Sequence, residues 1–241
     1  MEKWHIGCSG FYYAEWKGLF YPPEMPARLW FEYYCRHFNT VEINATFYRF
    51  PQLKTLNAWY DKSPPAFKFT VKVFQEITHQ RKFVDCSALI RDFYEIAKTG
   101  LKDKLGCILF QMPPGFHCSE NALALICAEL NPEFPNVVEF RHASWWQQKV
   151  YDQLAIHNIT FCSINYPKLP ETIVVNTAFP YVRMHGTPRL YYSGYADKTL
   201  KTLTDRLNQD AKIRQGFIYF NNTASGEAIL NARSIGEMLS D

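Results

Sequence analysis

The sequence lacks the short motifs that would identify several common enzyme classes. No GxGxxG follows the first candidate strand, and the chain contains no CxxC, HExxH or HxH. The missing glycine-rich turn argues against a dinucleotide-binding fold, in which that turn brings the backbone close to a pyrophosphate. The missing cysteine and histidine motifs argue against the common zinc sites. We therefore expect no cofactor, and a single divalent metal is the less favoured alternative.

Strong charge imbalance and long apolar runs are also absent. The 241 residues carry a net charge of +3 without any block of five like charges, which does not by itself indicate a nucleic-acid partner. No stretch is apolar for long enough to span a bilayer, and the opening MEKWHIGCSG lacks the apolar region of a signal peptide. The seven scattered cysteines are typical of buried, reduced thiols. We expect a cytoplasmic protein with no membrane partner, and no oligomeric state is indicated.

The sequence does contain a regular alternation of short β-rich runs and longer amphipathic stretches. Strands are predicted over 4–9, 40–44, 67–73, 105–111, 136–141, 159–164, 180–185 and 216–221. Helices are predicted over 28–37, 52–61, 86–99, 121–130, 145–157, 198–209 and 226–239. Strands that alternate with helices form parallel sheets, and eight such strands in this length favour a closed barrel. We expect an α/β protein with one domain over 1–241, a TIM-type (β/α)₈ parallel barrel; a doubly wound open sheet is the alternative.

One connection breaks this alternation. Residues 165–179 contain two prolines and no clear helical pattern. Proline removes a backbone donor and disfavours the interior of a helix. The helix after the sixth strand is therefore expected to be irregular or missing.

Side chains alternate between the two faces of each predicted strand, and in five strands one face is apolar and the other polar. In 136–141, for example, Val138 and Phe140 oppose Glu139 and Arg141. In a barrel, the polar face would point at the axis, near the C-terminal strand ends where barrel enzymes keep their sites. The axis-facing candidates are Glu42, Asn44, Lys72, Gln111, Glu139, Arg141, Arg183, His185, Tyr219 and Asn221. Because an unpaired buried charge costs several kcal/mol, these groups must pair or bind a ligand. A purely structural network of ion pairs is the alternative, with Glu139 bonded to Arg141 or Lys72 and Glu42 bonded to Arg183.

Residues in the loops after the strands extend the candidate binding site. They are Ser9, Tyr13, Tyr48, Trp145, Gly186 and Asn222. Aromatic side chains here would either stack on a planar ligand or cap the barrel. A glycine directly after the seventh strand would let backbone N–H groups approach a phosphate, as in many barrel phosphate sites.

Several stretches carry a family resemblance in the same chain order. They are IGCSGFYYAEWKGLFYP, FNTVEINATFYRFP, FKFTVKVFQEITH, LFQMPPGF, VEFRHASWW, YVRMHG and YFNNTASGEAILNA. The chain resembles the domain-of-unknown-function 72 family (DUF72, YecE-like). The resemblance implies a TIM barrel and no particular reaction. Asn221, Asn222 and Gly226 match the family pattern, but Thr223 stands where an aspartate is usual and Glu227 where a histidine is usual.

Together these patterns favour an enzyme that acts on a small anionic molecule, phosphorylated or carboxylated, by acid–base chemistry of a hydrolase or isomerase–lyase type. Glu42, Glu139 and His185 are the catalytic candidates, since paired carboxylates and histidine are the usual proton-transfer groups. Lys72, Arg141 and Arg183 are the anion-binding candidates, because guanidinium and ammonium groups match phosphate and carboxylate oxygens. The alternatives are a nucleic-acid binding or processing protein, with bases stacked on the aromatic loops, and a non-catalytic small-molecule binding protein.

Overall fold

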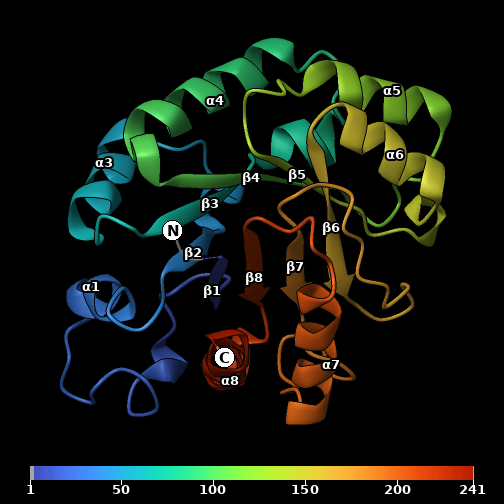
Figure 1. The fold of residues 1–241 in the computed structure, drawn as a ribbon. Helices are drawn as coiled ribbons and strands as arrows, with labels where there is room; N and C mark the ends of the chain where they lie inside the picture. The colour runs from blue at the N-terminus through green and yellow to red at the C-terminus, as the bar shows by residue number, and fades with distance from the viewer. Residues whose placement is uncertain (1–2, 241) are drawn as a thin grey trace.

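A computed structural model describes residues 3–240 of the chain. Eight parallel strands form a nearly closed barrel with the helices outside it (Figure 1). The strands are β1 (Trp4–Cys8), β2 (Thr40–Ile43), β3 (Lys68–Lys72), β4 (Leu105–Gln111), β5 (Asn136–Glu139), β6 (Ile159–Asn165), β7 (Tyr181–Met184) and β8 (Gly216–Phe220). All eight fall within or next to the ranges predicted from the sequence. The expected (β/α)₈ parallel barrel is confirmed, and the open-sheet alternative is wrong.

The helices follow the predicted pattern, with ends that differ from the prediction by at most three residues. They are α1 (Trp30–Tyr34), α2 (Ala45–Tyr48), α3 (Leu53–Lys62), α4 (Ser87–Leu101), α5 (Glu120–Glu129), α6 (Gln148–Ile156), α7 (Asp197–Asn208) and α8 (Glu227–Ser240). No helix separates β6 from β7, as the prolines of that segment predicted. The sequence did not indicate α2 or the π-helical turn η3 (Glu76–Gln80), both of which lie in loops above the barrel.

The end of β8 differs from the prediction by one residue. We expected this strand to end at Asn221 or Asn222, but it ends at Phe220. One further ladder bond follows, in which the Asn221 N–H donates to the Met184 carbonyl at 2.8 Å. Asn221 thus remains at the mouth of the barrel, while the chain turns away at Asn222 to start the loop before α8.

Side chains help to close the barrel between β1 and β2. The two strands share one isolated bridge, between Ser9 and Glu42. Deeper in the seam, the Tyr34 hydroxyl accepts a hydrogen bond from the Cys8 N–H at 2.7 Å and donates to the Thr40 carbonyl at 3.0 Å. This hydroxyl satisfies one backbone donor and one backbone acceptor, so it replaces a direct backbone hydrogen bond between β1 and β2.

The alternation along the strands separates two layers of the core. The helix-facing residues, among them Val138, Phe140, Val182 and Met184, belong to the large apolar layer between strands and helices. A smaller apolar cluster fills the barrel interior, formed by Cys107, Leu109, Val137, Cys162, Ile164, Tyr181, Phe217 and Tyr219. The charged residues of the same parity lie above this cluster. Because the small cluster fills the lower interior, the charged groups are confined to the C-terminal half of the barrel.

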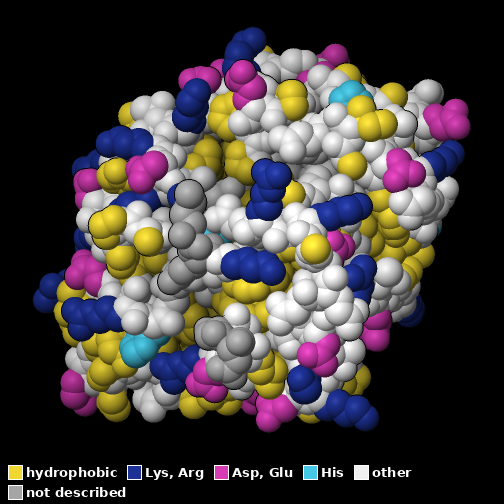
Figure 2. Space-filling view, in the orientation of Figure 1, with side chains coloured by type: hydrophobic (Ala, Val, Ile, Leu, Met, Phe, Trp, Pro, Cys, Tyr) yellow, Lys and Arg dark blue, Asp and Glu magenta, His cyan; other side chains and the backbone are white. Residues whose placement is uncertain are grey.

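The surface carries charges of both signs. Figure 2 shows basic and acidic side chains interspersed across the face that the C-terminus of α8 approaches. A cavity of about 1040 Å³ lies at this N-terminal end of the strands, lined by Trp4, Phe67 and Arg233 among others, away from the charged groups inside the barrel. All seven cysteines are unpaired, and six are buried. Among the described residues, no helix is long and apolar enough to cross a membrane.

Candidate functional site

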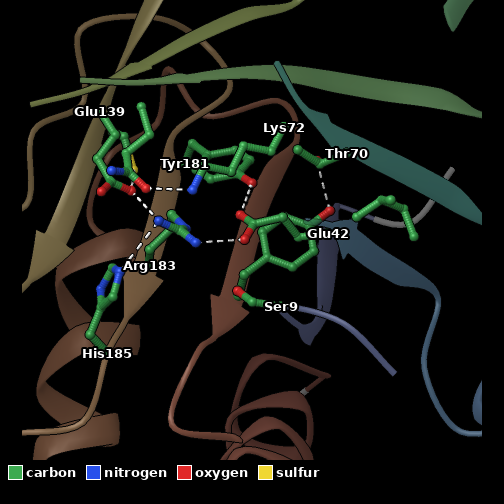
Figure 3. A network of polar contacts seen from close by, with 12 residues as sticks. Ser9, Glu42, Thr70, Lys72, Glu139, Tyr181, Arg183 and His185 are labelled. Atoms are coloured by element: carbon green, nitrogen blue, oxygen red, sulfur yellow. Dashed lines mark hydrogen bonds and ion pairs between the residues drawn. The ribbon is translucent and has the colours of Figure 1, made fainter. Parts of the chain in front are cut away.

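Arg183 occupies the centre of the polar network inside the barrel (Figure 3). Its Nη2 donates to Glu42 Oε1 at 2.7 Å, and its Nη1 donates to Glu139 Oε2. The second oxygen of Glu42 accepts a hydrogen bond from the Tyr181 hydroxyl at 2.6 Å. All four side chains are almost fully buried. One guanidinium on β7 therefore joins carboxylates from β2 and β5 across the barrel.

Arg141 forms the second ion pair with Glu139 and reaches the histidine that follows β7. Its Nε donates to Glu139 Oε1, and its Nη2 lies 2.8 Å from His185 Nε2. Because arginine can only donate, His185 Nε2 must accept, so the ring is neutral with its proton on Nδ1. Burial, followed by the charges of Arg141 and Arg183, holds the pKa of His185 well below its usual range. Tyr166 lies against the other side of Arg141, with 4.2 Å between the guanidinium carbon and the ring centroid.

Lys72 is the third cation, and its surroundings differ from those of the two arginines. Its Nζ donates to Gln111 Oε1 at 2.6 Å and lies 3.9 Å from the centroid of the Phe47 ring. In the described part of the chain, no carboxylate oxygen lies within ion-pair distance of this amine. Burial, followed by the charge of Arg183, lowers the pKa of Lys72 to about 8. A buried amine facing an amide and an aromatic ring is thus partly neutral near physiological pH.

Glu139 has the opposite electrostatic setting. Burial alone would raise its pKa, but the charges of Arg141 and Arg183 outweigh this effect and hold the pKa well below the usual range. Both carboxylate oxygens accept hydrogen bonds from guanidinium groups. Glu139 is therefore ionised at neutral pH and has little tendency to take up a proton.

Three of the predicted binding residues, Trp145, Tyr219 and Asn222, lie away from the charged groups. Trp145 stacks on Phe140 at 3.9 Å in the layer between strands and helices. The Tyr219 hydroxyl bonds to the hydroxyls of Thr40 and Thr70 deeper in the barrel. Asn222 is buried against α8 and the loop before α7, where its Nδ2 donates to the Ser193 carbonyl and to the Asn231 side chain.

The N–H of Gly186, which we expected to approach a phosphate, has a partner within the protein. Its backbone φ is +80°, and its N–H donates to the Tyr195 hydroxyl at 2.7 Å. A Cβ at this position would lie 2.7 Å from the Ser193 carbonyl oxygen. Glycine is therefore required by the tight turn after β7, and its N–H is not free for a phosphate.

The remaining predicted residues surround the network, and among the described residues none of their side chains has a hydrogen bond to it. Tyr13 donates to the Ser9 carbonyl at 2.6 Å. Tyr48 projects into solvent with 72% of its surface exposed. Asn44 and Asn221 are partly buried beyond the ends of β2 and β8. Ser9 lies beside Glu42 in Figure 3.

Some buried polar atoms at the centre have no hydrogen-bond partner among the described residues. They are Ser9 Oγ, Arg183 Nε and His185 Nδ1. Buried polar atoms are usually satisfied by protein or ordered water, so this region favours a polar occupant.

The two departures from the family pattern lie at the start of α8 and outside the ion network. The Thr223 carbonyl accepts a hydrogen bond from Trp16 Nε1 at 2.9 Å, which needs no particular side chain. Glu227 is the first residue of α8 and lies beside Gly194. Neither substitution alters a bond of the network.

Sequence reasoning missed Tyr181, Tyr166 and Phe47 as members of the site. Tyr181 has the same parity as Arg183 and His185, so the alternation along β7 was a usable signal. Tyr166 follows β6 directly, at the end of the barrel where binding residues gather. Phe47 lies on the unpredicted helix α2, and only the fold brings it to Lys72.

The donors of the site do not suit a metal ion. Within residues 3–240 no group of three histidine, cysteine, aspartate or glutamate side chains is placed to hold one. Both buried carboxylates already face guanidinium groups, whose positive charge opposes a divalent cation.

The fold and the network define a TIM-barrel protein with a buried, charged centre at the C-terminal ends of its strands. The family model described as "Protein of unknown function DUF72" matches residues 5–241, and the chain belongs to this family. It is 26% identical to UPF0759 protein YunF of Bacillus subtilis (strain 168), over 91% of this chain and 89% of the relative. It is 31% identical to UPF0759 protein YecE of Escherichia coli O157:H7, over 65% of this chain and 66% of the relative. The crystal structure of a DUF72 family protein from Thermotoga maritima MSB8 superposes with a TM-score of 0.90 at 29% identity, covering 100% of both chains.

Proposed function

We propose that the protein is an enzyme that binds a small anionic molecule, phosphorylated or carboxylated, at the barrel mouth and acts on it by acid–base chemistry. The observation that carries this proposal is Lys72, a cation at the mouth whose hydrogen-bond acceptor is an amide and not a carboxylate. The anion would supply the negative charge that this lysine lacks.

The balance of charge supports an anionic ligand. Lys72, Arg141 and Arg183 face two carboxylates, Glu42 and Glu139, and His185 is neutral. All four oxygens of the two carboxylates accept hydrogen bonds, which come from Arg183, Arg141 and Tyr181. With Lys72 mostly protonated at pH 7, about one positive charge is left over, and a buried charge of this kind favours a counter-ion.

Arg141 is the second group that we assign to the anion. A guanidinium has five N–H donors, and the bonds to Glu139 and His185 use two of them. The remaining donors are available to a phosphate or carboxylate, while Tyr166 fixes the plane of the group. Arg183 is different, because both its terminal nitrogens already contact carboxylates and only 1% of the residue is exposed. We assign Arg183 to holding the two carboxylates in place.

The proton-transfer role belongs to Lys72 within this proposal. A general acid or base works best when its pKa lies near the working pH, and the pKa of Lys72 is lowered to about 8. Glu42 and Glu139 have their oxygens occupied, and His185 uses Nε2 to accept from Arg141. We therefore assign these three residues to the ion network that positions Arg141 for the substrate.

Thermal unfolding with inorganic phosphate tests the proposal. At phosphate concentrations about 100 times Kd, binding stabilises the native state by about 2.7 kcal/mol, which raises Tm by roughly 5–10 °C for a chain of this size. We expect this gain in the wild type and its loss in Arg141→Met. Lys68→Met, at the opposite end of the strand that carries Lys72, is the matched control and should keep the gain.

For each variant, Tm is compared with and without phosphate, so a change in Tm caused by the mutation alone does not affect the result. Two results would show that the mouth is a structural ion network without an anion site. In the first, phosphate raises the Tm of Arg141→Met as much as that of the wild type. In the second, neither phosphate nor a carboxylate such as citrate changes the Tm of the wild type.

A further inference from the structure

We infer that Lys72 is an imine-forming lysine, and that the natural substrate is an anionic carbonyl compound whose aldehyde or ketone carbon reacts with Lys72 Nζ. The inference rests on the proposed anion site and adds the chemical class of the substrate. Its basis is the position of one buried amine at the mouth end of β3, in contact with an amide acceptor and an aromatic ring and near the charged groups Arg183, Glu139, Glu42 and Arg141.

The burial of Lys72 at the end of β3 favours the neutral amine, which is the nucleophilic form. Gln111 Oε1 and the Phe47 ring contact the Nζ and stabilise its ammonium form, but neither carries the full negative charge of an ion-pair partner. Desolvation and nearby cations are the two standard ways in which proteins activate a lysine nucleophile. Here burial has the largest effect on Lys72 and the charge of Arg183 adds to it, while the charges of Glu139 and Glu42 oppose it in part.

The site has the other parts that such a reaction needs. Lys72 is the last residue of β3, at the mouth end of the barrel. Gln111, its hydrogen-bond partner, lies in register with Glu139 on the neighbouring strand, and Glu139 bonds to Arg141. The amine of Lys72 and the guanidinium of Arg141 are therefore linked through side chains at the ends of the neighbouring strands β3, β4 and β5. An anionic group held by Arg141 would place a carbonyl carbon of the same small molecule near the amine.

The chemical step balances without an oxidant or reductant. The lone pair of neutral Nζ forms a bond to the carbonyl carbon, and the carbon–oxygen π bond breaks. Both N–H protons of the amine end on the oxygen, which leaves as water, and a carbon–nitrogen double bond remains. When solvent protonates this imine it carries a positive charge, which replaces the charge of the lysine at the mouth and withdraws electrons from the substrate.

Lys104 provides an internal comparison. Burial also lowers the pKa of Lys104, but its Nζ donates to the Tyr60 carbonyl, the Ser63 carbonyl and the Ser63 hydroxyl. All three N–H groups of its ammonium form have acceptors, and it lies away from the mouth. Burial alone is thus not the distinguishing feature of Lys72, and Lys104 serves as the buried control in the same sample.

The experiment uses the wild-type chain and pyridoxal 5′-phosphate, an anionic aldehyde, as the probe. The protein is incubated with the probe at pH 7, the imine is reduced with borohydride, and the modified lysines are identified by peptide mass spectrometry. A lysine with a pKa near 8 has about 200-fold more neutral amine at pH 7 than one near 10.4. We expect Lys72 to be labelled about 10- to 100-fold faster than Lys104 or exposed lysines such as Lys149. Inorganic phosphate should slow the labelling of Lys72 and leave Lys149 unchanged.

Two further arms separate this inference from the proposal on which it rests. Pyridoxal, which lacks the phosphate, should label Lys72 at least tenfold more slowly than its phosphate ester, and Arg141→Met should remove that difference. If phosphate stabilises the protein through Arg141 but Lys72 is labelled no faster than Lys104, the imine inference is wrong and the anion site stands. If Lys72 is labelled rapidly by both aldehydes without protection by phosphate, the anionic substrate class is wrong, and the proposed function fails with it.

Discussion

Replacing Lys72 with methionine should make the protein more stable at neutral pH, although a hydrogen bond is lost. The pKa of Lys72 falls from 10.5 to about 8 on folding, chiefly because of burial. At about 1.4 kcal/mol per pH unit, this fall corresponds to a cost of roughly 3 kcal/mol for keeping the amine protonated in the native state below pH 8. Methionine removes that cost but also the bond to Gln111, which contributes about 1 kcal/mol. We expect a net gain of about 2 kcal/mol at pH 7.

The sign of the effect changes with pH, which makes the prediction sharper. Between pH 8 and 10.5 the unfolded lysine binds more protons than the native one, so the contribution of Lys72 to stability rises with pH in this window. Above it, the amine is neutral in both states and the cost disappears. The advantage of Lys72→Met should therefore shrink as pH rises and become a loss of about 1 kcal/mol near pH 10.5.

Urea unfolding followed by circular dichroism at pH 7, 8, 9 and 10 measures this difference. The comparison with wild type at each pH cancels the titration of all other groups, and Lys68→Met corrects for the general loss of a lysine charge. A difference between Lys72→Met and wild type that stays constant within about 1 kcal/mol across this range would refute the reasoning. It would mean that Lys72 is protonated in the barrel as readily as in water, which would also remove the basis for its role in proton transfer.

Four other predictions follow from the placement of single residues. Arg183→Met leaves two buried carboxylates without one of their partners and should lower the free energy of unfolding by about 3–5 kcal/mol, which lowers Tm by roughly 10 °C. The control Arg189→Met, at an exposed position, should change the free energy of unfolding by less than about 0.5 kcal/mol. Equal melting temperatures of the two variants would contradict the central role of Arg183. Glu139 has a lowered pKa, so its stabilising effect is present above pH 4.5 and is lost as pH falls below it. Glu139→Gln should therefore have a lower Tm than the wild type at pH 7, and the difference in Tm should shrink as the melts are repeated at acidic pH. Trp145→Ala should lower the free energy of unfolding by about 3–5 kcal/mol, because it leaves a cavity in the core, but phosphate should still raise its Tm. If phosphate no longer raises the Tm of this variant, Trp145 contributes to the binding site. A titration with a mixed-sequence single-stranded oligonucleotide at two salt concentrations tests the nucleic-acid alternative; the small-anion proposal expects no binding at either, and salt-dependent binding would favour the alternative.

The sequence by itself determined the strands, most helices and the inward direction of the charges. Alternation of apolar and polar residues is a local property of an extended chain, so Glu139 and Arg141 had to share a face opposite Val138 and Phe140. The prolines after β6 likewise excluded a regular helix through local geometry alone. For these features the physical cause lies within a few residues of the effect.

Only the tertiary structure decided which charges meet and which side chains reach the mouth. The sequence left open whether Glu139 would pair with Arg141 or Lys72; the fold gives it Arg141 and Arg183 and leaves Lys72 to an amide. The direction of Trp145 could not be inferred, because alternation ends where the strand ends and a loop side chain follows the packing around it. The environment of Lys72 is set by residues from other elements, Gln111 on β4 and a ring on α2, and by its depth in the barrel. Burial and distance to other charges determine the pKa of an amine, and both depend on contacts between segments far apart in the chain.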